Sequence, residues 1–294
     1  MVLSQEFKCH FCDICDGHGC VAELPGMGGV YENANFISNC ADWDRYITSE
    51  ENTVSPKIRL APITGAMQNI GYPDEKSFYF DIVRASVYAG IRLAIGDGCP
   101  DEKLQFGIAA LQSVRKKGAV FIKPYENKRI LERMEWADTV SDIIGIDIDS
   151  YGILTMRNLV KLEKKTSSQI RELKTQTHKP FAIKGVFRPE DLEIVKSVHP
   201  DIVVISNHGG RVETVQGSTV SFLATYGKEL IKHTGTIWID GGIRKRRDIR
   251  IAGNLGATEV MIGRPFIMAL LKDGHKGIKK YLESMPTETL VTTE

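Results

Sequence analysis

The sequence predicts a (β/α)8 barrel preceded by a short N-terminal extension. From Lys57 onward, apolar runs of strand length alternate with stretches of helical length, which is typical of a parallel sheet covered by helices. The alternation repeats eight times, and polar residues gather where the apolar runs end. Eight units favour a closed barrel over an open doubly wound sheet, the structural alternative, which usually has fewer units and an early glycine-rich phosphate turn.

The expected elements follow one another without a proline- or serine-rich linker. Strands are expected at 58–63, 91–96, 119–123, 143–148, 180–186, 202–207, 236–240 and 259–263. Helices are expected near 74–89, 101–117, 127–140, 155–176, 188–198, 217–233, 244–254 and 265–282. A short helical stretch at 33–46 precedes the barrel, and Ser55-Pro56 marks a boundary. We therefore divide the chain into an N-terminal extension, 1–55, and a barrel, 56–294.

The composition argues against several classes of partner. The chain has 294 residues and a net charge of +1, so neither nucleic acid nor an anionic membrane surface is expected as a partner. No apolar run reaches the length of a membrane span. Met1 to Lys8 lack the apolar core of a signal peptide, so we expect a cytoplasmic protein with reduced thiols.

Four of the six cysteines lie close together near the start of the chain. Closely spaced thiolates in a cytoplasmic chain are typical of zinc or iron–sulfur sites. Zinc could also recruit His10 or His18. The alternative is a reduced loop without a metal. The candidate metal ligands are Cys9, Cys12, Cys15 and Cys20.

The segment 201–211 carries the residues best suited to catalysis. A buried strand at 202–205 is followed by Ser206, Asn207, His208, two glycines and Arg211. Histidine exchanges protons near neutral pH, and arginine binds carboxylates through two parallel hydrogen bonds. The pattern predicts a base and an anion clamp at a strand end, whereas the alternative is a surface turn that contains a histidine.

The other strand ends extend this candidate site, because the active sites of such barrels lie at the carboxyl ends of the strands. The last two ends contain glycines and arginines, which favour a phosphate site over solvated arginines on ordinary turns. Going along the chain, the ends are 62–65, 96–98, 123–125, 147–149, 184–185, 206–211, 240–244 and 263–265.

Four of these blocks resemble the FMN-dependent α-hydroxy acid oxidase and dehydrogenase family, which includes glycolate oxidase, lactate oxidase and flavocytochrome b2. The resemblance covers roughly residues 56–275 and is most specific in two motifs, Ser-Asn-His-Gly-Gly-Arg and Asp-Gly-Gly-Ile-Arg. The cysteine-rich start resembles a small bacterial branch of the family. The blocks are Ile183–Val186, Val204–Arg211, Ile239–Arg244 and Ile262–Phe266.

The resemblance implies FMN as the cofactor and a small L-2-hydroxy acid, lactate-like or glycolate-like, as the substrate. His208 would be the base, Arg211 would bind the carboxylate, Asp149 would support the protonated histidine, and Tyr125 would contact the substrate. A homotetramer is also implied. The residues implied in cofactor binding are Pro62, Ile63, Thr64, Lys123, Lys184, Ser206, His208, Asp240, Gly242, Arg244, Gly263 and Arg264.

The chain departs from the family pattern around the flavin. Lys123 stands where the family usually has Gln, and Asp147 where it usually has Thr. Residues 96–98 replace a serine-rich segment, and the early substrate tyrosine has no match. Arg157 is the nearest candidate for a second carboxylate-binding arginine. These departures keep two alternatives open: an FMN-binding redox sensor that responds through its N-terminal cysteines, and an FMN-dependent isomerase on the same scaffold.

Overall fold

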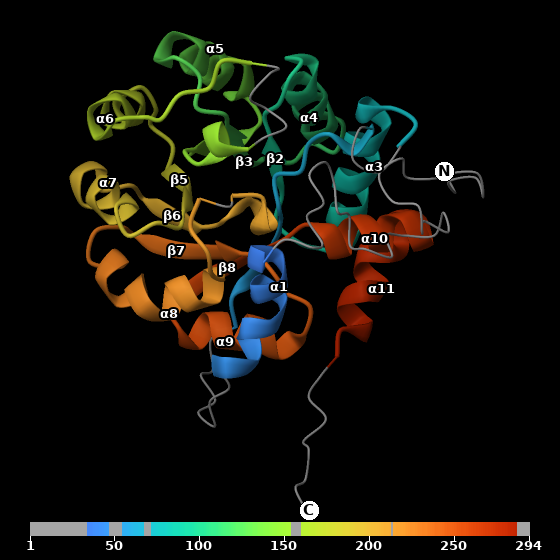
Figure 1. Cartoon of the computed structure of the whole chain (residues 1–294). Coiled ribbons are helices and arrows are strands. Elements are labelled where there is room, and N and C mark those ends of the chain that lie inside the picture. Colours follow the sequence, from blue (N-terminus) through green and yellow to red (C-terminus); the bar gives the residue numbers. More distant parts are fainter. Residues whose placement is uncertain (1–33, 47–54, 68–71, 154–159, 213, 287–294) are drawn as a thin grey trace, which may run out of the picture.

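Eight parallel strands form the centre of the molecule (Figure 1). The computed structural model describes residues 34–46, 55–67, 72–153, 160–212 and 214–286. Each strand pairs with its neighbours in chain order, which confirms the predicted α/β architecture. The strands are β1 (Lys57–Leu60), β2 (Ala94–Gly96), β3 (Gly118–Ile122), β4 (Ser141–Asp147), β5 (Phe181–Val186), β6 (Ile202–Ile205), β7 (Thr236–Asp240) and β8 (Ala257–Ile262).

The sheet closes on itself between its first and second strands. β1 pairs with β8 on one side, and on the other side Arg59 forms a parallel bridge with Arg92, just before β2. The amide of Leu60 donates to the carbonyl of Arg92 at 2.9 Å, and the amide of Arg92 donates to the carbonyl of Ile58 at 3.0 Å. These bonds pair the edges that an open sheet would leave free, as the barrel prediction requires.

Helices surround the barrel (Figure 1). No helix in the described ranges combines the length and apolar character needed to span a bilayer. The barrel helices are α3 (Glu75–Tyr88), α4 (Glu102–Ser113), α5 (Asn127–Ala137), α6 (Ser167–Thr175), α7 (Asp191–Val198), α8 (Thr219–Leu230), α9 (Arg246–Asn254), α10 (Arg264–Asp273) and α11 (Gly277–Ser284).

Two predicted helices differ from the observed ones. Within the described part of the stretch expected as a helix near 155–176, which starts at residue 160, the helix begins at Ser167, because Thr166 and Gln169 form a capping box that fixes its start. The stretch expected as one helix at 265–282 is two helices. Gly274, with φ of 60°, ends α10, and α11 then packs back so closely that a Cβ on Gly277 would lie 1.8 Å from a carbonyl of α10.

Alternating strand residues fill the barrel interior and the layer beneath the helices. On β7, Trp238 points into the barrel, whereas Ile237 and Ile239 pack under the helices. Phe121 fills much of the interior, and it fits because residue 145 is glycine. A Cβ there would lie 2.5 Å from the Phe121 ring. This packing makes the barrel a solid support for the loops at its carboxyl end.

A short N-terminal segment covers part of that end. It consists of α1 (Ala34–Ala41) and the 3-10 turn η2 (Asp42–Tyr46), which confirms the helical stretch expected at 33–46. α1 packs against η5 (His208–Gly210), the turn that follows β6, and η2 packs against α8 and α9. Figure 1 shows α1, in blue, in front of β8 and close to α9.

A buried ion pair occupies the opposite, amino-terminal end of the barrel. Arg59 donates to Glu259 at 2.8 Å and to the carbonyl of Leu93 at 2.6 Å, and its guanidinium lies 4.5 Å from the centre of the Trp238 ring. Arg92 also pairs with Glu259. Because Arg59 is only 2% exposed, its charge depends on Glu259 for compensation.

We predict that Glu259→Gln lowers the free energy of unfolding by about 3–5 kcal/mol, because it leaves the buried Arg59 cation without an anion. Urea denaturation followed by circular dichroism measures this loss. The matched control is Glu283→Gln on α11, where Glu283 and Lys279 form an exposed pair. It should change stability by less than about 0.5 kcal/mol. Equal effects of the two substitutions would contradict the role assigned to Glu259.

Candidate active site

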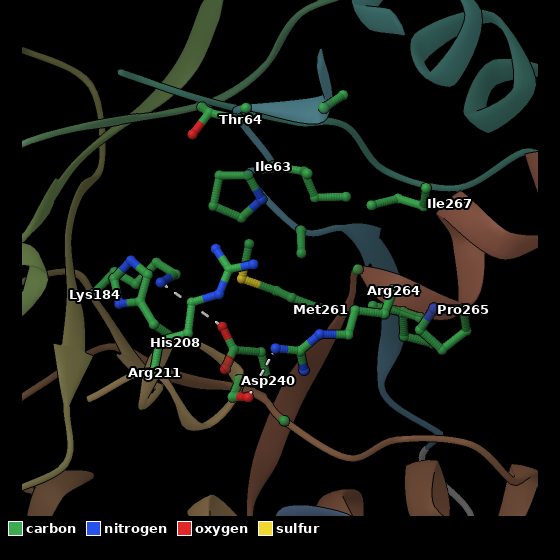
Figure 2. A pocket seen from close by; sticks show the side chains of 18 of the residues that line it. Ile63, Thr64, Lys184, His208, Arg211, Asp240, Met261, Arg264, Pro265 and Ile267 are labelled. Atoms are coloured by element: carbon green, nitrogen blue, oxygen red, sulfur yellow. Dashed lines mark hydrogen bonds and ion pairs between the residues drawn. The ribbon is translucent and has the colours of Figure 1, made fainter. Parts of the chain in front are cut away.

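A cavity of about 410 Å³ opens at the carboxyl ends of the strands (Figure 2). Its volume lies in the usual range for small-molecule sites. Most of the residues predicted for the site line it. They are Pro62, Ile63, Thr64, Lys123, Lys184, His208, Arg211, Asp240, Gly242, Arg244, Gly263 and Arg264.

One end of the cavity suits an anion. The amino-terminal end of α10 lies there, with Gly263, Arg264 and Pro265 in the wall, and Arg244 approaches from the loop after β7. The first amides of a helix and its dipole favour negative charge. Arg264 also donates to the carbonyl of Gly209 at 2.9 Å, and its guanidinium stacks over Phe36 at 4.8 Å. This arginine therefore joins α10, the turn after β6 and α1.

The middle of the cavity is apolar. Figure 2 shows Ile63 and Ile267 on one side and Met261 deeper in the cavity. Ala61 and Pro62 continue the wall along the end of β1. Such a surface accepts a flat apolar group between the anion-binding end and the polar groups at the other end.

Ser206 links the polar groups at the other end. Its hydroxyl accepts hydrogen bonds from the Nζ of Lys184 at 3.1 Å and from the amide of His208 at 3.2 Å. The same hydroxyl donates to Asp240 at 2.8 Å. The other oxygen of Asp240, Oδ1, is buried without a partner in the described structure, and burial raises the pKa of this carboxyl. A buried acceptor without a donor is costly, so this oxygen is suited to a ligand that brings one.

Arg211 extends its guanidinium into the cavity (Figure 2). The Nε atom is buried without a hydrogen-bond partner in the described structure, and burial lowers the pKa of the side chain. An uncompensated guanidinium beside a histidine is suited to binding a carboxylate through two hydrogen bonds.

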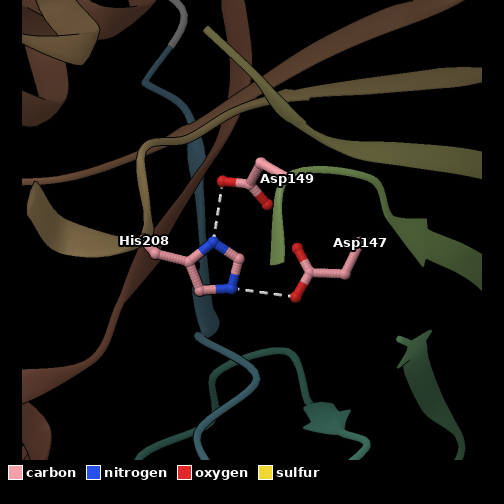
Figure 3. A group of neighbouring side chains, drawn as sticks. All are labelled: Asp147, Asp149 and His208. Atoms are coloured by element: carbon pink, nitrogen blue, oxygen red, sulfur yellow. Dashed lines mark hydrogen bonds and ion pairs between the residues drawn. The ribbon is translucent and has the colours of Figure 1, made fainter. Parts of the chain in front are cut away.

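His208 lies between two carboxylates (Figure 3). Its Nδ1 is 2.8 Å from Asp149 and its Nε2 is 2.9 Å from Asp147. Burial alone would lower the pKa of the imidazole, but Asp147 and Asp149 outweigh it, so the pKa is raised. Asp149 lies behind the histidine rather than in the cavity wall, as expected for a group that supports the protonated ring.

Two lysines also pair with Asp147. Lys123 lies 3.0 Å and Lys184 3.2 Å from its carboxylate oxygens. Burial would raise the pKa of Asp147, but His208 and the two lysines hold it well below its usual range. Asp147, Asp149 and His208 have the composition of a metal site. However, the two ammonium groups would repel a cation and already compensate the carboxylates, so we interpret the group as an ion-pair cluster.

The turn that carries His208 has a left-handed backbone. His208 has φ of 55°, and Gly209 and Gly210 follow with φ of 64° and 97°. For histidine this conformation costs roughly 1 kcal/mol or more. Asn207 stabilises it, because its side-chain oxygen accepts the amide of Gly210 at 3.0 Å. The turn directs the imidazole toward the ends of β4 and β5.

Asn39 of α1 fixes Asn207 in turn, and the sequence analysis did not identify it. The two buried side chains exchange hydrogen bonds of 2.8 and 3.2 Å, and Asn39 also accepts the amide of Thr219 at 3.0 Å. Asn35 and Asn39 are four residues apart on one helix face, and this spacing was the available indication of a buried polar face.

The approach of α1 explains several of the glycines. A Cβ on Gly210 would lie 2.6 Å from the amide nitrogen of Phe36, and one on Gly242 would lie 1.7 Å from the carbonyl oxygen of Asn39. Trp43 of η2 donates to the carbonyl of Gly241 at 3.1 Å. The Gly241-Gly242 turn, expected to bind phosphate, is therefore also required for packing against α1.

Tyr125 does not line the cavity. It is 1% exposed, and the guanidinium groups of Arg129 and Arg133 each lie 4.4 Å from the centre of its ring. Conversely, Cys99, Lys103 and Ile153 line the cavity although the sequence analysis did not select them. The four cysteines near the N-terminus and Arg157 lie outside the described residues.

The chain is similar in sequence to known proteins. The model of the FMN-dependent dehydrogenase family matches residues 127–293. A 2-hydroxyacid oxidase of Dictyostelium discoideum is 34% identical over 123 residues, which are 42% of this chain and 31% of the relative. An L-lactate oxidase of Lysinibacillus sphaericus is 34% identical over 124 residues, 42% of this chain and 32% of the relative. The matches thus span about a third of these relatives.

Solved structures support the fold. A crystal structure of mandelate oxidase with benzoyl-formic acid superposes with a TM-score of 0.66 at 22% identity, covering 89% of this chain and 84% of that one. The same enzyme with (S)-2-phenylpropionate gives a TM-score of 0.66 at 21% identity, covering 90% of this chain and 86% of that one. At this level of identity the likeness is evidence for the barrel fold alone.

We predict that Asn39→Ala lowers the free energy of unfolding by about 1–3 kcal/mol, because it removes both hydrogen bonds with the buried Asn207 side chain and the acceptor of the Thr219 amide. Urea denaturation measures the loss. Ile37→Ala on the same helix is the control, since Ile37 is 54% exposed. This control shows whether truncating an exposed side chain of α1 lowers the free energy of unfolding by the same amount. If Asn39→Ala cost no more than Ile37→Ala, the amide pair would not hold the turn.

Proposed function

The chain belongs to the FMN-dependent dehydrogenase family, and from this premise we propose that it oxidises a small L-2-hydroxy acid to the 2-oxo acid with FMN bound in the cavity. The observation that carries the proposal is that His208, as proton acceptor, lies in the same cavity as Arg211, which forms no ion pair within the described part of the chain. Because the chain spans only about a third of its curated relatives, the activity is our inference.

The residues present fit FMN. The end of the cavity near α10 and Arg244 suits a phosphate group, and the apolar middle suits a flat ring system. At the other end, the unpartnered Oδ1 of Asp240 offers an acceptor and the Nζ of Lys184 a buried cation. Burial opposes the charge on Lys184, but the Asp147 and Asp240 carboxylates raise its pKa, so it remains a cation that stabilises negative charge on a bound ring.

Substrate binding and proton transfer fall to the loop after β6. Arg211 would hold the substrate carboxylate, and His208 would take the proton of the hydroxyl group. Asp149, 2.8 Å from Nδ1, would stabilise the imidazolium that forms. Bound FMN supplies the acceptor for the hydride that leaves the substrate carbon.

The experiment that tests this function is an anaerobic absorption spectrum of the purified protein before and after addition of L-lactate or glycolate. We expect flavin bands that bleach with substrate. A flavin spectrum that stays unchanged with these and larger 2-hydroxy acids would contradict the reaction and favour the redox-sensor alternative. Absence of flavin after incubation with FMN would contradict the cofactor assignment.

We predict that His208→Ala lowers the rate of flavin bleaching by about 100-fold or more, because general-base catalysis typically contributes 10²–10⁴ in rate. Flavin should remain bound, since the phosphate end of the cavity is unchanged. Stopped-flow absorbance measures the rate, and the ratio of absorbance at 450 and 280 nm, used only as a flavin-content assay, checks occupancy on the order of one per chain. Retained bleaching would exclude His208 as the base.

We predict that Arg211→Met weakens binding of the hydroxy acid by about 10- to 100-fold, as expected for loss of a charge-assisted hydrogen-bonded pair of about 1.5–3 kcal/mol. The dependence of the bleaching rate on substrate concentration measures this effect. Arg84→Met on the outer face of α3 is the matched control, because Arg84 is exposed and outside the cavity. An unchanged substrate dependence in Arg211→Met would refute the carboxylate clamp.

A further inference from the structure

Both ring nitrogens of His208 contact a carboxylate. Nδ1 is bonded to Asp149, so Nε2 is the atom left to accept a proton from a substrate hydroxyl. In this structure Nε2 lies 2.9 Å from Asp147. Figure 3 shows the ring held between the two carboxylates. The protonation of the ring therefore depends on Asp147 as well as on Asp149.

The two contacts determine the protonation of the ring. A neutral imidazole has one N–H, so with two ionised carboxylates one contact would set a nitrogen lone pair against an oxygen lone pair. Protonation of Asp147 would remove this repulsion between lone pairs. It is unfavourable, because Lys123 and Lys184 stabilise the ionised carboxylate. An imidazolium, in which both ring nitrogens donate, satisfies both contacts.

The neighbouring strands bring charges of both signs to the ring. Lys123 on the β3 side and Lys184 on β5 supply two cations. Asp147 on β4 and Asp149 after it contact the ring, and Asp240 on β7 lies 3.8 Å from Lys184. Arg211 lies on the same loop as the histidine, and Arg264 of α10 bonds the carbonyl of the adjacent Gly209. α1 contributes the amide of Asn39 and no charge to this cluster.

We propose that Asp147 is a positioning residue that keeps His208 doubly protonated in the resting site, so that Nε2 must lose its proton and its Asp147 contact before it can accept the substrate proton. This inference rests on the proposed function for its catalytic meaning. The proton on Nε2 leaves to solvent or a buffer base, Asp147 stays ionised on its two lysines, and the substrate hydroxyl then takes the place of Asp147 beside Nε2. One proton leaves and one arrives, so the ring returns to the imidazolium.

The pH at which activity rises should therefore be higher than the pH expected for an isolated histidine. The active base is the neutral ring, and its pKa is raised by the two carboxylates, so the active form grows as the pH rises above the ordinary histidine range. Replacing Asp147 by an uncharged residue removes one of these carboxylates. The rise should then move to lower pH.

The test combines two readouts on the flavin-loaded full chain. The first is an NMR titration of ¹⁵N-labelled histidine, with the His208 resonances assigned by their loss in His208→Ala. We expect the ring of the unchanged protein to stay doubly protonated above the ordinary histidine range, and its midpoint in Asp147→Asn to fall by about one pH unit or more. The second is the pH profile of anaerobic bleaching, whose rise should shift in the same direction.

Three further variants keep the test decisive. Asp147→Glu retains the carboxylate and should keep the high midpoint. Lys123→Gln combined with Asp147→Asn removes one charge of each sign, so it gives a smaller shift in the same downward direction if the single variant fails to fold. Asp101→Asn is the control, because Asp101 pairs with Arg129 and Arg133 rather than with His208.

The outcomes separate the two proposals. A His208 midpoint that is the same in the unchanged protein and in both Asp147→Asn variants would overturn the role of Asp147, whatever the protein oxidises. A midpoint that shifts as expected, in a protein whose flavin no hydroxy acid bleaches, would uphold the role of Asp147 in holding the imidazolium. That result would contradict only the proposed reaction.

Discussion

The site depends on the mutual compensation of charges that the barrel buries at the carboxyl ends of its strands. Asp147, Lys123 and Lys184 are each less than 10% exposed, and charges so far from water are tolerated only when they are paired. Asp147 is the common partner: it joins the ends of β3 and β5 to the histidine after β6. The ring of His208 is therefore oriented by ion pairs rather than by packing alone, and we propose that the same contacts set its protonation.

The site also depends on contacts that hold the turn of His208 in place. A histidine with left-handed φ needs neighbours that keep the turn in place, and here these neighbours come from a helix that precedes the barrel in the chain. Asn39 bonds Asn207, and Phe36 lies under the guanidinium of Arg264. The barrel supplies the reactive groups, whereas α1 and η2 cover and fix the turns that carry them. The functional unit thus includes residues 34–46 as well as the barrel.

The barrel and most of the cavity wall could be predicted from the sequence, because both depend on local patterns. Buried parallel strands are continuous apolar runs, and each strand end meets the others at one face. The features that could not be predicted depend on contacts between distant segments. Tyr125 follows β3 as a substrate residue would, yet it is buried against Arg129 and Arg133 of α5 instead of lining the cavity. The bond between Asp147 and Nε2 of His208 joins residues 61 positions apart, and no local pattern indicates it.

The glycines beside α1 have a consequence for comparing sequences. Gly242 tolerates no side chain, because the main chain of Asn39 occupies the space that a Cβ would need. The glycine at this position therefore reflects its contact with α1 as well as the expected phosphate site. A search that treats the Asp-Gly-Gly motif as a marker of phosphate binding would count it even in a chain that had lost α1. In such a chain the left-handed backbone of the turn, with φ of 100° at Gly241 and 72° at Gly242, would still favour glycine, so the motif alone does not show that the helix is present.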